Sequence, residues 1–320
     1  YVFQPGVVGD AVIAAGRDGT VARFEGGRQV WKVSLEGKLS AGVGASQRVA
    51  VVVSEKGEAI ALDAASGEVK WRAQVNAEVL APPGVGDNLV VVRTSDNRLI
   101  GLDTADGKRK WLYQRNNPPL ALRNFTAPMI ESGLALVGFP GGKLVGVALN
   151  NGGALFELTV ASPRGATELE RVADVSGPPV VLRQEVCAVA YQGRIACFDG
   201  SNGNTMWSRD FSSAAGLDRD NRQIYVTDDK DAVQALDAST GASAWKQDVF
   251  ARRELTRPAV FSSYVAVADR EGYVHLLQRE DGKLVARARP DSSAVRAMRA
   301  YGGGVLVQTQ AGGVYALSVR

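Results

Sequence analysis

A glycine followed four residues later by a large aromatic side chain recurs along the whole chain. In most copies an Ala-Leu-Asp segment, or a close variant of it, lies just before the glycine. The position four residues after the glycine is held in seven successive copies by Trp31, Trp71, Trp111, Phe156, Trp207, Trp245 and, in a degenerate copy, Ala286. A repeat of about 40 residues made of short strands is typical of a β-propeller, in which each repeat forms one blade.

The third copy contains the strands expected within one blade. Residues 89–93, 99–102 and 110–112 are rich in apolar side chains, and turns that contain Asp, Asn or Gly separate them. This pattern favours strands joined by hairpins. No helical periodicity persists for more than two turns anywhere in the chain.

An eighth, incomplete copy ends the chain. Residues 304–320 supply two strands, but no tryptophan strand follows them, and residues 1–10 resemble the inner strand of a first blade. A propeller commonly closes by letting its N-terminal segment complete the last blade, so we expect the closing strand upstream of Tyr1. We therefore predict an all-β fold, an eight-bladed β-propeller with four-stranded antiparallel blades, as a single domain over residues 1–320.

Each residue of the motif has a structural explanation. A positive φ in the turn is easily adopted by glycine, and the preceding aspartate can accept hydrogen bonds from backbone N–H groups of that turn. The tryptophan provides a large apolar face for the gap between neighbouring blades, while its N–H needs a carbonyl partner. We therefore interpret the glycines as structural rather than as a phosphate-binding loop.

The composition argues against several classes of protein. Lys and Arg total 37 and Asp and Glu total 34, with both signs interspersed, whereas nucleic-acid binding needs a concentrated basic face. One His and two Cys are too few for a His/Cys metal cage. No apolar run approaches the ~20 residues of a transmembrane helix. We expect no metal, no cofactor and no nucleic-acid partner.

The two cysteines allow two interpretations. Cys187 and Cys197 are equally distant from Gln192, beside a predicted hairpin turn, so they could face each other across two strands. In an oxidising compartment they could form a cross-strand disulfide. The alternative is a pair of reduced thiols packed as small apolar side chains.

The repeat resembles the blade motif of the quinoprotein, or PQQ-like, propeller superfamily. Two longer segments indicate one family within this superfamily. They are residues 120–128, Leu-Ala-Leu-Arg-Asn-Phe-Thr-Ala-Pro, and residues 164–175, Arg-Gly-Ala-Thr-Glu-Leu-Glu-Arg-Val-Ala-Asp-Val. Together with Asp269-Arg270-Glu271-Gly272-Tyr273 and Asp291-Ser292-Ser293, they resemble the BamB family of outer-membrane assembly lipoproteins over the whole chain.

The resemblance implies a non-enzymatic scaffold at the periplasmic face of the Gram-negative outer membrane. Its members carry a lipidated N-terminal Cys, which would lie upstream of Tyr1, and they bind the POTRA domains of the barrel insertase BamA; unfolded barrel proteins are further partners to expect. The family's partner-binding Leu-x-Leu-Arg segment corresponds to Leu120, Leu122 and Arg123. Its Asp-x-Asp pair corresponds to Asp174 and Ser176, so the second acid is replaced here.

The loop lengths favour the same region. The segments from Trp111 to Pro128 and from Phe156 to Pro178 are long and join consecutive blades, and long loops on a rigid scaffold often carry function. We expect Leu120, Leu122, Arg123 and Asp174 to form one exposed patch, and expect restoring Asp at position 176 to alter binding only modestly. In the alternative interpretation the leucines pack on the adjacent blade and Arg123 binds backbone carbonyls.

Two other functions share the expected fold. A PQQ-dependent quinoprotein dehydrogenase would hold its quinone and a calcium ion over the propeller axis, but the chain lacks inserted loops that would supply calcium ligands. A ligand-sensing propeller would be followed by a transmembrane or catalytic segment. The lone His275 lies in a predicted strand, where we expect a packed side chain rather than a ligand.

Overall fold

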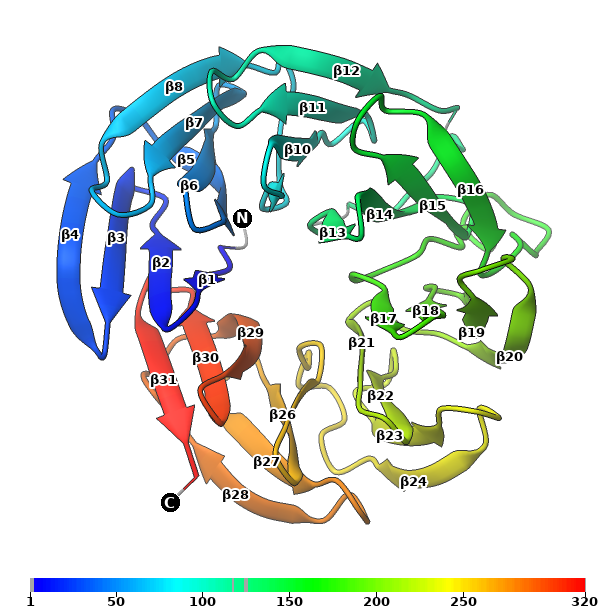
Figure 1. The fold of residues 1–320 in the computed structure, drawn as a ribbon. Helices are drawn as coiled ribbons and strands as arrows, with labels where there is room; N and C mark the ends of the chain where they lie inside the picture. The colour runs from blue at the N-terminus through cyan, green and yellow to red at the C-terminus, as the bar shows by residue number, and fades with distance from the viewer. Residues whose placement is uncertain (1–2, 117, 124–125, 320) are drawn as a thin grey trace. The chain divides into compact units, whose positions relative to one another are not determined.

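The computed structural model describes residues 3–116, 118–123 and 126–319. Within these residues the chain forms strands and turns, and no helix is present that could cross a membrane. Consecutive strands pair antiparallel into eight successive sheets, seven with four strands and one with three (Figure 1). These sheets are the blades of the predicted eight-bladed β-propeller, and the prediction of the fold class is confirmed.

The strands of the first four sheets follow chain order. They are β1 (Gly6–Val8), β2 (Ala11–Ala15), β3 (Thr20–Glu25) and β4 (Arg28–Ser34); β5 (Leu39–Ala45), β6 (Val49–Ser54), β7 (Glu58–Asp63) and β8 (Val69–Gln74); β9 (Gly84–Val85), β10 (Leu89–Arg93), β11 (Leu99–Asp103) and β12 (Arg109–Tyr113); and β13 (Met129–Glu131), β14 (Leu134–Phe139), β15 (Lys143–Ala148) and β16 (Ala154–Thr159).

The last four sheets repeat this order, except that the final one has three strands. They are β17 (Val180–Leu182), β18 (Glu185–Val189), β19 (Gly193–Asp199) and β20 (Thr205–Phe211); β21 (Gly216–Arg219), β22 (Gln223–Thr227), β23 (Val233–Asp237) and β24 (Ser243–Gln247); β25 (Ala259–Phe261), β26 (Tyr264–Ala268), β27 (Val274–Gln278) and β28 (Leu284–Ala288); and β29 (Val295–Tyr301), β30 (Gly304–Thr309) and β31 (Val314–Ser318). The strands expected in the third repeat match β10, β11 and β12.

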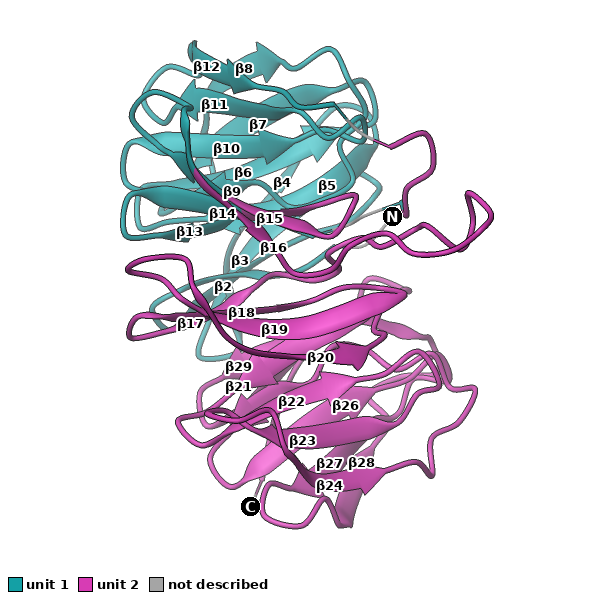
Figure 2. Ribbon diagram, turned by 90° about the vertical axis from the view of Figure 1, so that its right-hand side faces the viewer, with its two compact units in different colours: residues 1–116, 123–136, 146–155 teal, residues 117–122, 137–145, 156–320 magenta. Residues whose placement is uncertain are grey.

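The chain divides into two compact units (Figure 2). Residues 1–116, 123–136 and 146–155 make up unit 1, which contains the first three sheets in full. Residues 117–122, 137–145 and 156–320 make up unit 2, which contains the last four sheets in full. The contacts of the candidate site described below each lie within one of these units.

The apolar core lies between neighbouring sheets. Between the second and third sheets, Val51 and Ala61 pack with Val90 and Ile100, and the Trp71 side chain belongs to the same cluster. The tryptophan of one blade thus forms part of the contact with the next blade. This placement confirms the role predicted for the aromatic position.

Each indole N–H of the motif tryptophans donates to a backbone carbonyl of the following sheet. The acceptor is always three residues before the motif glycine of that sheet. Trp31, Trp71, Trp111, Trp207 and Trp245 donate to the carbonyl oxygens of Ala64, Thr104, Leu149, Ala238 and Arg279 at 3.2, 2.9, 2.7, 2.7 and 2.8 Å. The sequence motif therefore encodes a junction between two blades as well as a turn within one.

The motif glycine also receives the indole of the preceding blade. Gly107 has a φ of 72°, and a Cβ placed there would lie 2.6 Å from Cε3 of Trp71. Both the backbone conformation and the packed indole exclude a larger residue. The carboxylate of Asp103 accepts a hydrogen bond from the Ala105 N–H at 2.7 Å, and this bond and the nearby Lys110 lower the pKa of Asp103. These contacts support the structural interpretation of the glycine and aspartate.

Candidate partner-binding loops

The first long loop connects β12 to β13 and carries three of the residues expected to bind a partner. Leu120 is 42% exposed, Leu122 is half-buried and the Arg123 side chain is 61% exposed. Asn124 and Phe125 of the same segment lie outside the described residues. The exposure of Leu120 argues against the alternative in which this leucine simply fills the adjacent blade.

Asp174 lies at the base of the second long loop, and it is buried, with 2% of its surface exposed. One carboxylate oxygen accepts a hydrogen bond from the Leu122 N–H at 2.5 Å, and the other accepts one from the Gly141 N–H at 3.2 Å. The expectation that Asp174 belongs to an exposed patch is therefore wrong. Hydrogen bonds from backbone N–H groups stabilise a buried carboxylate. The bond from the Leu122 N–H also holds the loop that carries Leu122 against Asp174.

Arg123 has an acidic neighbour that the sequence did not indicate. Its guanidinium lies 2.7 Å from a carboxylate oxygen of Glu78, and the Glu78 side chain is 41% exposed. The two residues are 45 positions apart, and no local pattern links them. Since exposed ion pairs contribute little net free energy, breaking the pair of Arg123 with Glu78 would cost little.

Ser176, at the position of the family's second acid, is also buried, with 6% of its surface exposed. Its hydroxyl donates a short hydrogen bond to the backbone carbonyl of Ser213. An Asp at this position would place a carboxylate in the interior, and the expected modest effect on binding stays a prediction.

The second long loop, between β16 and β17, has an ordered turn at its outer end. The Thr167 hydroxyl accepts a hydrogen bond from the Glu170 N–H at 3.3 Å, and the Glu170 carboxylate accepts one from the Thr167 N–H at 3.1 Å. This reciprocal pair has the pattern of a capping box, which here closes a turn rather than starting a helix. Leu169, which the sequence analysis did not single out, lies in this turn and is 72% exposed.

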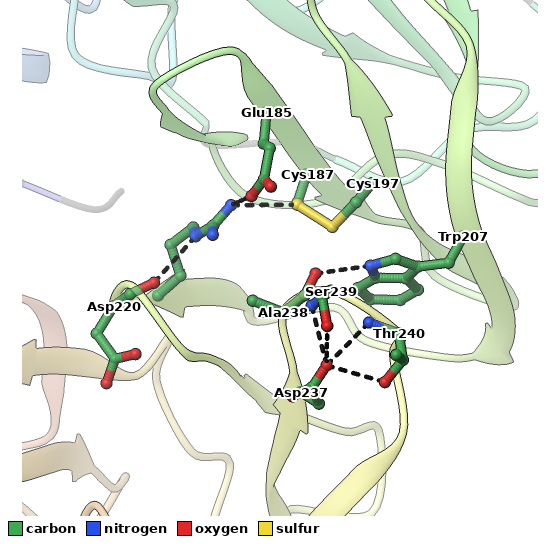
Figure 3. Close-up of a disulfide and its surroundings, with 10 residues drawn as sticks. Glu185, Cys187, Cys197, Trp207, Asp220, Asp237, Ala238, Ser239 and Thr240 are labelled. Carbon is green, nitrogen blue, oxygen red and sulfur yellow. Dashed lines mark hydrogen bonds and ion pairs between the residues drawn. A yellow bond between two sulfur atoms is a disulfide. The ribbon is translucent and has the colours of Figure 1, made fainter.

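Cys187 and Cys197 are paired residues on β18 and β19, and the structure joins them in a disulfide (Figure 3). Their Cα atoms are 4.1 Å apart and both side chains are fully buried. Cys197 is also paired with Trp207 on β20, so the crosslink lies beside a junction tryptophan. From the next sheet, the Arg219 guanidinium lies 3.8 Å from the Cys187 sulfur and 2.7 Å from the Glu185 carboxylate.

His275 is buried, as expected of a packed side chain, with 4% of its surface exposed. Its Nε2 lies 2.8 Å from the carboxylate of Asp269, which also pairs with Arg253 at 2.8 Å. Burial alone would raise the pKa of Asp269, but the hydrogen bonds from His275 and the Tyr273 N–H hold it below its ordinary value. Among the described residues no group of three or more His, Cys, Asp or Glu side chains is arranged to hold a metal ion.

Comparison with known proteins places the chain in a family. The family model described as "Outer membrane protein assembly factor BamB" matches residues 17–247 and 230–320. A protein of that name from Bordetella pertussis is 44% identical over 311 residues, which cover 96% of this chain and 80% of the relative.

Solved structures agree with this relationship. The crystal structure of BamB from Moraxella catarrhalis matches with a TM-score of 0.93 at 27% identity and covers 99% of this chain and 96% of that one. Quinohemoprotein alcohol dehydrogenase from Comamonas testosteroni matches with a TM-score of 0.74 at 12% identity, over 96% of this chain and 70% of that one, which shows a shared fold only. The chain belongs to the BamB family of outer membrane protein assembly factors.

Proposed function

We propose that this chain is a non-enzymatic scaffold subunit of the outer-membrane β-barrel assembly machinery and that it binds the periplasmic POTRA domains of BamA. In this proposal a lipid anchor upstream of Tyr1 holds the propeller at the periplasmic face of the outer membrane, and unfolded barrel proteins are further clients. The observation that carries the proposal is the loop of Leu120, Leu122 and Arg123, exposed at its outer side and fixed from below by Asp174.

The chemistry of this loop suits a protein partner. Exposed or half-exposed leucines supply apolar surface, and an arginine beside them supplies a planar donor that pairs well with carboxylates or carbonyls. Because the Asp174 carboxylate already holds the Leu122 N–H, little backbone entropy is lost when a partner binds. Leu122 and Arg123 would contact the partner, while Asp174 would act as a positioning residue.

Ser176 fits a supporting role in this proposal. Its hydroxyl is engaged by the Ser213 carbonyl below the surface, so it would contribute to binding only by shaping the base of the second long loop.

Titration of the full chain with isolated BamA POTRA domains tests the proposal. We expect Arg123→Ala to weaken binding by about 2 kcal/mol if Arg123 is a hot spot, with Leu122→Ala also weaker and melting temperatures nearly unchanged. Arg28→Ala serves as a matched control, since Arg28 is an exposed arginine on β4. Wild-type affinity in both loop variants would show that the loop is structural only.

A quinoprotein dehydrogenase-like enzyme is the competing function, and it follows from the shared fold alone. Adding the quinone with calcium to the purified chain and recording the absorbance spectrum tests it directly. A stable bound-quinone spectrum would replace the scaffold proposal, whereas an unchanged spectrum together with POTRA binding would support it.

A further inference from the structure

Leu169 is the most exposed of the large apolar side chains on the described part of the chain, at 72%. It lies in the outer turn of the loop between β16 and β17, whereas most of the other highly exposed apolar side chains project from edge strands. An exposed leucine alone is common on protein surfaces. The surroundings of this one distinguish it.

The turn that carries Leu169 is held by its own hydrogen bonds. Besides the reciprocal Thr167 and Glu170 pair, the Ala166 N–H donates to the Glu170 carboxylate at 2.7 Å, and Arg171 donates to the Gly165 carbonyl at 3.0 Å. The hydrogen bonds to the Glu170 carboxylate lower the pKa of Glu170, so the capping carboxylate stays charged. Leu169 is therefore displayed on an ordered turn rather than on a loose loop.

Gly165 lets this turn close. Its φ is 137°, and a Cβ placed there would lie 2.3 Å from the Cβ of Glu170. A larger residue would push Glu170 away from the two N–H groups that it accepts. Gly165, Thr167 and Glu170 therefore stabilise a turn that exposes an apolar side chain, Leu169.

The part of the same loop that follows Leu169 contacts the first long loop. Val172, Ala173 and Val175 follow Leu169 in the chain and are buried, and Asp174 among them accepts a hydrogen bond from the Leu122 N–H. Leu120, Leu122 and Leu169 all belong to unit 2, and the bond from the Leu122 N–H to Asp174 links the two loops that carry them.

We propose that Leu169 is a further apolar anchor for the POTRA domains, acting with Leu120 and Leu122 on one two-loop surface. The inference rests on the proposed function and extends it to a residue outside the Leu-x-Leu-Arg segment. The occupant that fits is a folded domain with an apolar depression for Leu169 and apolar surface for Leu120 and Leu122. Binding would bury most of the Leu169 side chain, which gains hydrophobic free energy. Because the turn is already ordered, little conformational entropy would be lost.

Binding of the full chain to isolated BamA POTRA domains tests the inference with four variants, each compared with the wild-type chain. Leu169→Ala should raise Kd about tenfold and leave the melting temperature unchanged, and Leu122→Ala should also raise Kd. Leu155→Ala is the matched control, because Leu155 is 65% exposed on the outer strand β16; its Kd should equal the wild-type value. Thr167→Ala combined with Glu170→Ala keeps Leu169 but removes the capping box, and it should raise Kd severalfold.

The outcomes separate this inference from the function on which it rests. If Leu169→Ala binds like wild type while Leu122→Ala is weakened, Leu169 is not an anchor and the proposed function stands. If Leu155→Ala weakens binding as much as Leu169→Ala, the effect is not specific to the loop and the inference fails. If the wild-type chain does not bind POTRA domains, both proposals are overturned.

Discussion

The carboxylate of Asp174 accepts a hydrogen bond from the backbone N–H of Leu122, a residue 52 positions earlier in the chain. The bond joins the two longest loops, from the middle of the first to a buried residue near the end of the second. An acidic residue that resembles a contact residue in sequence is thus buried in the structure, where it holds the backbone of the first long loop.

Replacing Asp174 by Ala should impair both stability and binding. The Leu122 and Gly141 N–H groups would lose their acceptor, and each unsatisfied buried donor costs about 1–3 kcal/mol. Asp174→Asn keeps one acceptor oxygen, so it should lose less stability and less affinity than Asp174→Ala. Urea unfolding and POTRA titration measure the two effects, and unchanged affinity in Asp174→Ala would contradict the positioning role.

Replacing Ser176 by Asp should destabilise the chain rather than tune its surface charge. The new carboxylate would face the Ser213 carbonyl in a buried position, and burying an unsatisfied polar group costs at least about 1–3 kcal/mol. Ser176→Ala, which removes the hydroxyl without adding charge, is the control. Equal denaturation midpoints for Ser176→Asp and wild type would refute this prediction.

Trp71→Ala should cost about 3–5 kcal/mol, because the side chain is only 7% exposed and fills the junction with the next blade. Trp71→Phe keeps an aromatic ring but leaves the Thr104 carbonyl without its donor, so about 1–2 kcal/mol is expected. Trp31→Ala should lose less stability than Trp71→Ala, since the Trp31 side chain is only half-buried. Thermal or urea unfolding checks the order of the three variants.

The disulfide predicts that both thiols resist labelling until they are reduced. An alkylating reagent added to the denatured chain should modify Cys187 and Cys197 only after reductant is present, as read by mass spectrometry. The double variant Cys187→Ala, Cys197→Ala should be less stable by about 2–3 kcal/mol, because a crosslink over about ten residues restricts the unfolded chain. Labelling without reductant would instead indicate two packed thiols.

Asp291 should make stability depend on pH in the acid range. Hydrogen bonds from the Thr309 and Ser293 hydroxyl groups, at 2.7 Å each, with the Ser293 N–H, lower its pKa to about 2. Because the pKa is lower in the folded state than in the unfolded state, the stabilisation is present above about pH 4 and disappears as the pH falls toward 2. Asp291→Asn should unfold at a lower temperature than wild type at pH 6, and this difference should shrink by pH 2.

Most of the fold follows from the repeat in the sequence. The spacing from Gly107 to Trp111 indicates both a turn and the outer strand that follows it. The indole N–H and the ring of Trp111 then need a carbonyl and an apolar surface, which the next blade of the repeat supplies. These requirements are local and periodic, so one chain displays them several times. The capping box of Thr167 and Glu170 was predictable for the same reason, because its two hydrogen bonds join residues three positions apart.

The candidate site was predicted less completely, because its decisive contacts join residues far apart in sequence. Asp174 lies in a Val-Ala-Asp-Val segment, whose apolar neighbours hint at burial, but nothing local identifies the Leu122 N–H as its partner. The pairing of Glu78 with Arg123 has no sequence signal either. Leu169 was overlooked because a leucine within a charged loop has no fixed meaning until its exposure is known.

The junctions formed by the tryptophans also bear on how the chain can acquire its structure. Each of the five indole hydrogen bonds spans only 31 to 38 residues. A blade can therefore dock as soon as the turn of the next blade has formed, without waiting for the distant end of the chain. Contacts of this moderate span favour stepwise folding, in which one blade after another packs against its neighbour.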